Sequence, residues 1–164
     1  MAKKTKKVSK AAEVKLAKAL ETIRAFSTEE ASLNGVALRD IYQVNKDSLN
    51  QITFTLDFRN FGVSAVTDSA VLHDVNGTDK TLVSGVTGSI LNEPVGTNEE
   101  ANGKFLNILS SVMATNETPV PQDLKVDFSI TGGAAPRNYT IPNATFNSVG
   151  DRIIIDISIF FFHV

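Results

Sequence analysis

The sequence contains no cysteine and no tryptophan, and the lack of cysteine excludes several kinds of site. No disulfide framework, thiolate zinc site or cysteine nucleophile can form. Because small extracellular eukaryotic modules often depend on disulfides, their absence favours a bacterial, cytosolic or viral origin. Only two histidines occur, His73 and His163, and neither has a second histidine at metal-ligand spacing. Nucleophile-elbow and phosphate-binding glycine motifs are also missing. We therefore expect no enzyme activity, no catalytic residue, no metal and no cofactor.

Long apolar runs are scarce as well. No apolar stretch of signal-peptide type follows Met1. The longest apolar run, 153–162, is too short to span a bilayer and is interrupted by Asp156 and Ser158. With 164 residues, 42% of them hydrophobic and 21% charged, the chain is expected to form one folded domain with an appended arm.

Charge is divided unevenly along the chain. Residues 1–26 carry eight basic and two acidic side chains, a net charge of +6, and the other residues carry −8. Such a division predicts an anionic partner for the arm, either nucleic acid or an acidic protein surface, although a solubilising tail is the alternative. Because the arm contains lysine rather than arginine, non-specific contact is favoured over base readout. No aromatic residue interleaves with these lysines, so a stacking platform for single strands is absent. The predicted contact residues are Lys3, Lys4, Lys6, Lys7 and Lys10.

A helical pattern follows the arm. Apolar residues recur at three- and four-residue spacing, which predicts an amphipathic helix over residues 12–26; they are Ala12, Leu16, Ala19, Leu20 and Ile23. Asn34-Gly35 is a stop or turn signal. We place the arm and helix in residues 1–30 and a β domain in residues 31–164.

The β domain begins with strict alternation at 52–59, where the apolar residues Ile52 to Phe58 alternate with polar ones. Asn60-Phe61-Gly62 then predicts a turn, and further strands are predicted at 63–72, 81–83, 86–91, 124–130 and 139–146. Asn76-Gly77 is the strongest hairpin signal. The surrounding oxygen-rich residues, Asp74 to Asp79, weakly resemble a calcium loop, but a hairpin turn is the preferred interpretation.

Residues 97–114 have helical periodicity. Thr97 and Glu100 stand at capping-box spacing. Six apolar residues between Phe105 and Met113 follow a helical repeat, although Gly103 weakens the pattern. This segment predicts a helix inside the β domain.

The closing strand, predicted at 152–164, is apolar on both faces. Such a strand must be covered on both faces, whereas a two-layer sandwich normally leaves one face wet. The cover is expected to come from another subunit, with Phe160, Phe161 and Phe162 at the interface. The alternative is cover by residues 12–26 of the same chain.

Together these patterns predict an antiparallel β-sandwich or jelly roll with an N-terminal helix and one short internal helix. A basic arm at Lys3 to Lys10, a helix, the strand at 52–59 with its turn and the closing strand at 153–162 resemble the layout of small bacteriophage virion proteins of coat, minor-capsid or penton type. This resemblance is architectural. It implies a non-catalytic, homo-oligomeric structural subunit, assembled in the host cytoplasm and located in the virion with other virion proteins. The alternatives are a carbohydrate- or surface-binding sandwich module of spike or adhesin type and a non-specific nucleic-acid-binding protein.

Overall fold

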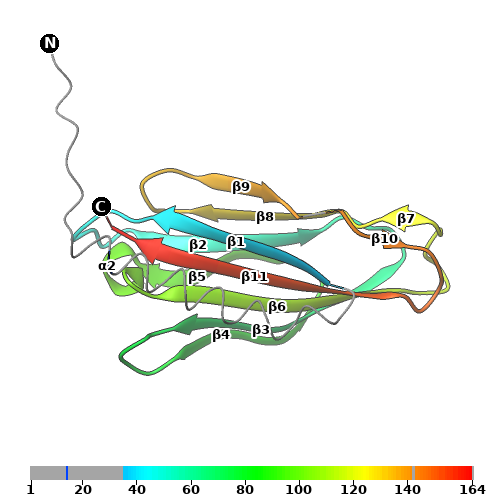
Figure 1. The fold of residues 1–164 in the computed structure, drawn as a ribbon, viewed down its shortest axis with the longest axis horizontal. Helices are drawn as coiled ribbons and strands as arrows, with labels where there is room; N and C mark the ends of the chain where they lie inside the picture. The colour runs from blue at the N-terminus through cyan, green and yellow to red at the C-terminus, as the bar shows by residue number, and fades with distance from the viewer. Residues whose placement is uncertain (1–13, 15–34, 142, 164) are drawn as a thin grey trace, which may run out of the picture.

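The computed structural model describes residue 14 and residues 35–141 and 143–163 of the chain. The described part is mainly β, with two larger sheets packed face to face and a two-stranded ribbon at one end (Figure 1). The prediction of a β-sandwich is therefore confirmed. The predicted arm and N-terminal helix, apart from residue 14, lie outside the described residues.

One layer is a five-stranded sheet in the order β1-β11-β6-β3-β4. Its pairs are antiparallel except for β1 and β11, which run parallel, so the first and last strands of the described domain lie side by side. The parallel pair departs from the wholly antiparallel arrangement that we expected. The strands are β1 (Gly35–Gln43), β3 (Val63–His73), β4 (Lys80–Thr87), β6 (Phe105–Ala114) and β11 (Arg152–Phe162).

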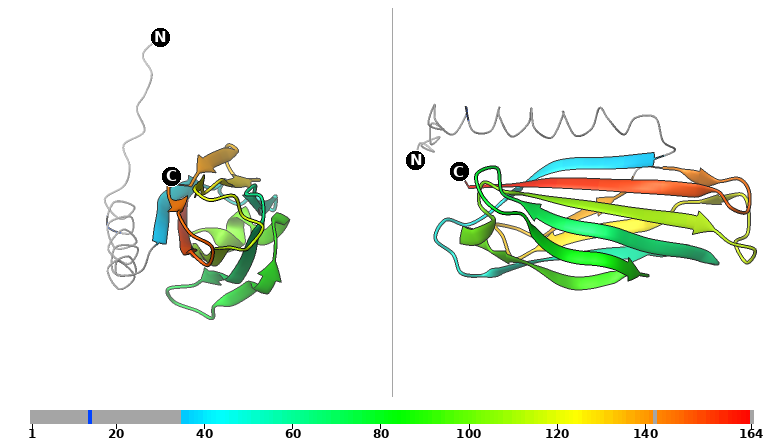
Figure 2. Two further views of the ribbon diagram at one scale, coloured as in Figure 1. Left: turned by 90° about the vertical axis from the view of Figure 1, so that its right-hand side faces the viewer. Right: turned by 90° about the horizontal axis from the view of Figure 1, so that it is seen from below.

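The opposite layer is a four-stranded antiparallel sheet in the order β5-β2-β8-β9. Its strands are β2 (Gln51–Phe58), β5 (Ile90–Thr97), β8 (Val126–Thr131) and β9 (Arg137–Thr140). The ribbon consists of β7 (Gln122–Asp123) and β10 (Thr145–Phe146). Seen end-on in Figure 2, the sheets enclose a single space.

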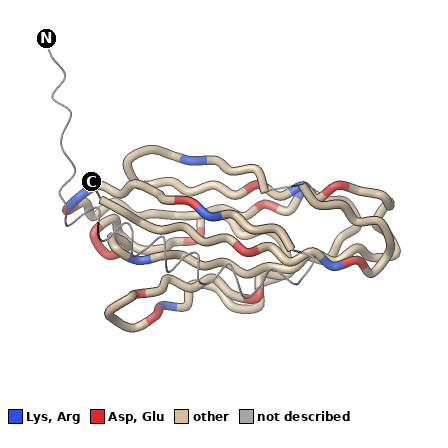
Figure 3. Tube along the Cα trace, in the orientation of Figure 1, with Lys and Arg blue, Asp and Glu red and all other residues tan. Residues whose placement is uncertain are grey.

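The main core fills that space with the inward residues of both sheets. The four-stranded sheet contributes Phe54, Leu56 and Phe128, and the closing strand contributes Ile155 and Ile157, all of them buried. Alternation along each strand produces this arrangement, because successive side chains point to opposite faces of a sheet. Figure 3 shows that charged residues are sparse along the central strands.

The internal helix is far shorter than its periodicity predicted. Helix α2 (Asn98–Ala101) has four residues and begins with the expected capping box between Thr97 and Glu100. The chain then turns at Gly103, where φ is +81°, and continues as strand β6. The prediction of a helix up to residue 114 is therefore wrong. Strand β6 lies between β3 and β11 and is largely buried, so both of its faces carry apolar residues and imitate a helical repeat.

Candidate assembly surfaces

The outer face of the five-stranded sheet, which points away from the four-stranded sheet, has an apolar cluster of its own. Buried Phe105 and Phe160 form its centre, and Ile41 and Phe162 pack against them. The Phe160 and Phe162 rings are stacked with their centroids 6.2 Å apart. The Phe105 ring also stacks on His73 at 4.6 Å. This cluster is separate from the main core, so the sheet is apolar on both of its faces.

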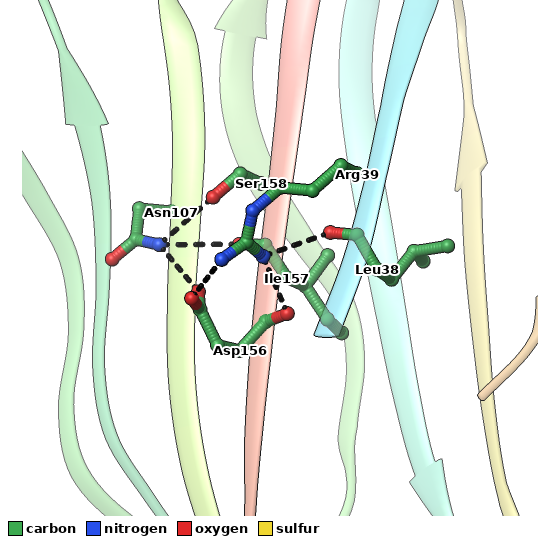
Figure 4. Close-up of polar contacts among 6 residues, drawn as sticks. All are labelled: Leu38, Arg39, Asn107, Asp156, Ile157 and Ser158. Atoms are coloured by element: carbon green, nitrogen blue, oxygen red, sulfur yellow. Dashed lines mark hydrogen bonds and ion pairs between the residues drawn. The ribbon is translucent and has the colours of Figure 1, made fainter. Parts of the chain in front are cut away.

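A polar network lies beside this cluster on the same face (Figure 4). Arg39 of β1 forms an ion pair with Asp156 of β11 and donates a hydrogen bond to the Asp156 carbonyl at 2.8 Å. Asn107 of β6 donates to the other Asp156 carboxylate oxygen at 2.9 Å and to Ser158 Oγ at 3.1 Å. The two charged side chains are mostly shielded from water, with exposed fractions of 18% for Arg39 and 10% for Asp156. The network thus joins three adjacent strands and pairs Arg39 with Asp156 on this face.

The four-stranded sheet has a different outer face. Its central strands β2 and β8 point Thr53, Thr55, Asp57, Asp127 and Ser129 outward, and none of these residues is buried. Ser89 Oγ donates to Asp57 at 2.9 Å, and Arg59 pairs with Asp57 and Asp127. The Ser89 hydroxyl, followed by Arg59, lowers the pKa of Asp57. The outer face of the four-stranded sheet is therefore polar and wet, whereas that of the five-stranded sheet combines an apolar cluster with the network around Asp156.

The three phenylalanines predicted at a subunit interface fall on two faces. Phe161 is fully buried in the main core, where its ring meets the Tyr42 ring edge-on at 6.1 Å. Phe160 and Phe162 belong to the outer face. Only these two are therefore placed to contact a layer outside the sandwich.

A second apolar surface lies on loops at the end of the sandwich that carries β7 and β10, opposite the end with α2 (Figure 1). It consists of Phe61, Val120 and Val149, which are 72%, 38% and 51% exposed. We call these three residues the loop-end surface. The turn at Phe61 was predicted from the sequence, but this surface was not, because residues on three separate loops give no local pattern.

Hydrogen bonds hold these loops in place. Gln122 Oε1 accepts from Phe61 N at 3.2 Å and from Asn60 Nδ2 at 2.6 Å, and Gln122 Nε2 donates back to the Phe61 carbonyl at 3.2 Å. The hydroxyls of Thr115 and Thr118 both donate to the Gly62 carbonyl. The loop that carries Val149 is tied to the same region through Gly150 N, which donates to the Ala114 carbonyl at 2.9 Å. The exposed apolar side chains thus stand on a preorganised support.

Among the remaining predicted sites, the oxygen-rich segment from Asp74 to Asp79 is described by the structure and has a structural role. Asp74 accepts from the amide of Asn76 at 3.0 Å and pairs with Lys104 at 3.3 Å, as expected for a turn. Asp79 contacts His73 Nδ1 at 2.8 Å. Across the described residues, no group of three or more His, Cys, Asp or Glu side chains is arranged to hold a metal ion. The five arm lysines, Lys3 to Lys10, lie outside the described residues.

Comparisons with known proteins gave no match to a family model, a curated protein or a solved structure. In the part of the chain that the structure describes, no helix has the length and apolar character needed to cross a membrane.

Proposed function

We propose that this chain is a non-catalytic structural subunit of a bacteriophage virion and that it assembles with copies of itself and with other virion proteins. The observation that carries the proposal is the loop-end surface, where Phe61 is 72% exposed on an anchored turn. Large apolar side chains held in water are costly unless a partner covers them, and such patches commonly mark contact sites.

The rigidity of the support strengthens this interpretation. A contact residue on a preorganised loop loses little conformational entropy on binding, so more of its burial contributes to affinity. The side chains of Asn60 and Gln122 are committed to holding the turn, which leaves Phe61 free to contact a neighbour. The layout predicted from the sequence, a basic arm and a helix before the sandwich, supports a virion as the particle, and the arm lysines are proposed to contact nucleic acid or an acidic neighbour.

Light scattering and native mass spectrometry of the full chain test the proposal. The wild-type protein should form a ring-sized or particle-sized species, whereas Phe61→Asp should shift it toward monomer because a carboxylate would be buried at the contact. Leu49→Asp is the matched control, since Leu49 is 74% exposed in the loop between β1 and β2 and lies outside the loop-end surface. A clean wild-type monomer at micromolar concentration would overturn the proposal. Equal loss of assembly in both variants would show that the loop-end surface is not the assembly contact.

A further inference from the structure

The hairpin that joins β3 to β4 (Figure 1) carries an asparagine followed by a glycine. Asparagine is chemically labile in proteins, and it loses its side-chain amide when the backbone nitrogen of the next residue attacks its Cγ atom. A following glycine favours this attack, because it has no Cβ atom to hinder the approach and its backbone rotates freely. Two such pairs, Asn76-Gly77 and Asn102-Gly103, lie wholly within the described residues, so the same dipeptide is present in two structural settings.

Asn76-Gly77 lies in an exposed loop outside the β ladder. At this end of the hairpin the last paired residues are Leu72 and Lys80, and both Asn76 and Gly77 are exposed. No described residue forms a hydrogen bond with the Asn76 side chain, and only its backbone N–H is engaged, donating to Asp74 Oδ1 at 3.0 Å. Gly77 N donates to the Asp74 carbonyl at 3.3 Å, which is long for such a bond. The attacking nitrogen and the attacked amide can therefore meet without disturbing a strand.

Asn102-Gly103 is equally exposed but is bound to the closing strand and the residue after it. Gly103 N donates to the carbonyl of Phe161, a fully buried residue of β11, at 2.9 Å. Asn102 Oδ1 accepts from the His163 amide at 3.1 Å. Attack at Asn102 therefore requires Gly103 N to leave the Phe161 carbonyl and the side-chain amide to leave His163. Each ordinary hydrogen bond contributes a factor of about five to an equilibrium constant, so these two bonds protect Asn102 by more than tenfold.

We propose that Asn76 is a site of spontaneous deamidation in the folded protein and that the fold protects Asn102 from the same reaction. Gly77 N forms a bond to Asn76 Cγ while the bond from Cγ to Nδ2 breaks, and the departing amide takes the proton of Gly77 N and leaves as ammonia. Water then opens the resulting cyclic imide at either carbonyl. One product is aspartate, and the other is isoaspartate, in which the main chain runs through the former side chain. No further reactant takes part.

Either product changes the loop but not the sheet. In the imide Gly77 N has no proton, so its bond to the Asp74 carbonyl is lost at that stage. Both products place a carboxylate where a neutral amide stood, in a loop that already contains Asp74 and Asp79, so the protein becomes more negative as it ages. Because the ladder begins at Leu72 and Lys80, the melting temperature should change little. This inference concerns a different part of the molecule from the proposed assembly contact and does not depend on it.

Peptide mapping by mass spectrometry tests the proposal, because replacing an amide by a carboxyl group raises the mass of the peptide that contains it. In the full-length protein aged in mildly alkaline buffer, Asn76 should be converted at least tenfold faster than Asn102. The same protein unfolded in guanidinium chloride is the matched control, and there the two residues should react at similar rates. Equal rates in the folded protein would overturn the proposal. A difference of the same size in both conditions would also overturn it, since the fold would then not be the cause.

Isoaspartate provides an independent readout of the cyclic intermediate. An enzyme that methylates isoaspartate should place labelled methyl groups on the peptide that contains residue 76 in the aged protein. Asn76→Gln should remove this label, because its longer side chain would have to close a larger ring. Asn102→Gln is the matched control and should leave the label on that peptide unchanged. Absence of the label from the aged wild-type peptide would overturn the proposed route through the imide.

Discussion

Replacing Gly62 by alanine should destabilise the protein far more than an ordinary glycine substitution in a turn. Gly62 has φ of +69°, a left-handed conformation that disfavours other residues. A Cβ atom placed there would lie 2.4 Å from the Glu117 carbonyl oxygen and 2.7 Å from the Thr118 amide nitrogen. Both neighbours are backbone atoms, so the clash cannot be relieved by a side-chain rotation.

The magnitude follows from two contributions. The left-handed conformation costs alanine roughly 1–2 kcal/mol. Relief of the clash requires the loop at residue 117 to move, which would weaken the bonds from Thr115 and Thr118 to the Gly62 carbonyl, each contributing about 1 kcal/mol. Gly62→Ala should therefore cost about 3–4 kcal/mol in the free energy of unfolding.

Gly85→Ala is the matched control. Gly85 has a similar φ of +64°, but a Cβ atom there meets nothing within 4 Å. Its substitution should cost only the conformational term, roughly 1–2 kcal/mol. Urea denaturation monitored by circular dichroism should thus separate the two variants by about 2 kcal/mol, which corresponds to a midpoint difference of about 1 M. Equal midpoints would show that the close packing of Gly62 against the loop does not restrain the turn.

Three further predictions concern the titration of the tyrosines, the partly buried ion pair between Arg39 and Asp156, and the arm. Burial raises the pKa of Tyr42 and raises the pKa of Tyr139 to about 12; since the folded protein then retains protons that the unfolded chain has lost, stability should fall between about pH 10 and 12. Because the sequence has no tryptophan, absorbance at 295 nm of Tyr42→Phe should report Tyr139 alone, and half-ionisation near pH 10 in the folded state would contradict the expectation. Asp156→Ala should cost about 2–3 kcal/mol in urea denaturation by leaving the half-buried Arg39 without its partner. The double variant Asp156→Leu with Arg39→Met should cost much less, and equal costs would refute the pairing argument. Deletion of residues 1–10 should flatten the salt dependence of nucleic-acid binding in a filter-binding assay, and absence of binding by the full chain at low salt would exclude that partner.

Sequence patterns predicted the elements in which local alternation and final burial agree. Strand β2 is the clearest case, since its inward residues Ile52, Phe54 and Leu56 are all buried. The hairpin at Asn76-Gly77 joins β3 to β4, as its turn signal predicted. In these places a local stretch of about ten residues is enough to determine the structure.

The predictions failed for elements whose structure depends on tertiary contacts. The segment that forms β6 satisfies a helical repeat and a strand repeat equally well, and only its position between β3 and β11 selects the strand. Strand β1 was missed because Arg39 and Asp40 interrupt its apolar pattern. Their partners are Asp156 and Arg137, both about a hundred residues away in the sequence. No local pattern could have supplied those contacts.

The size of the loop-end surface has a consequence for how such a subunit would assemble. With exposed fractions of 72%, 38% and 51%, the three side chains can bury on the order of 300 Å², well under half of the roughly 800 Å² per partner in a stable pairwise interface. One such contact is therefore weak, and stable association requires each subunit to make several contacts at once. In a closed symmetric particle the second and later contacts are effectively intramolecular, so their combined strength exceeds that of any single contact. Assembly through this surface should accordingly be absent at low protein concentration and rise steeply above a threshold, and a gradual monomer–dimer equilibrium in a dilution series would contradict it.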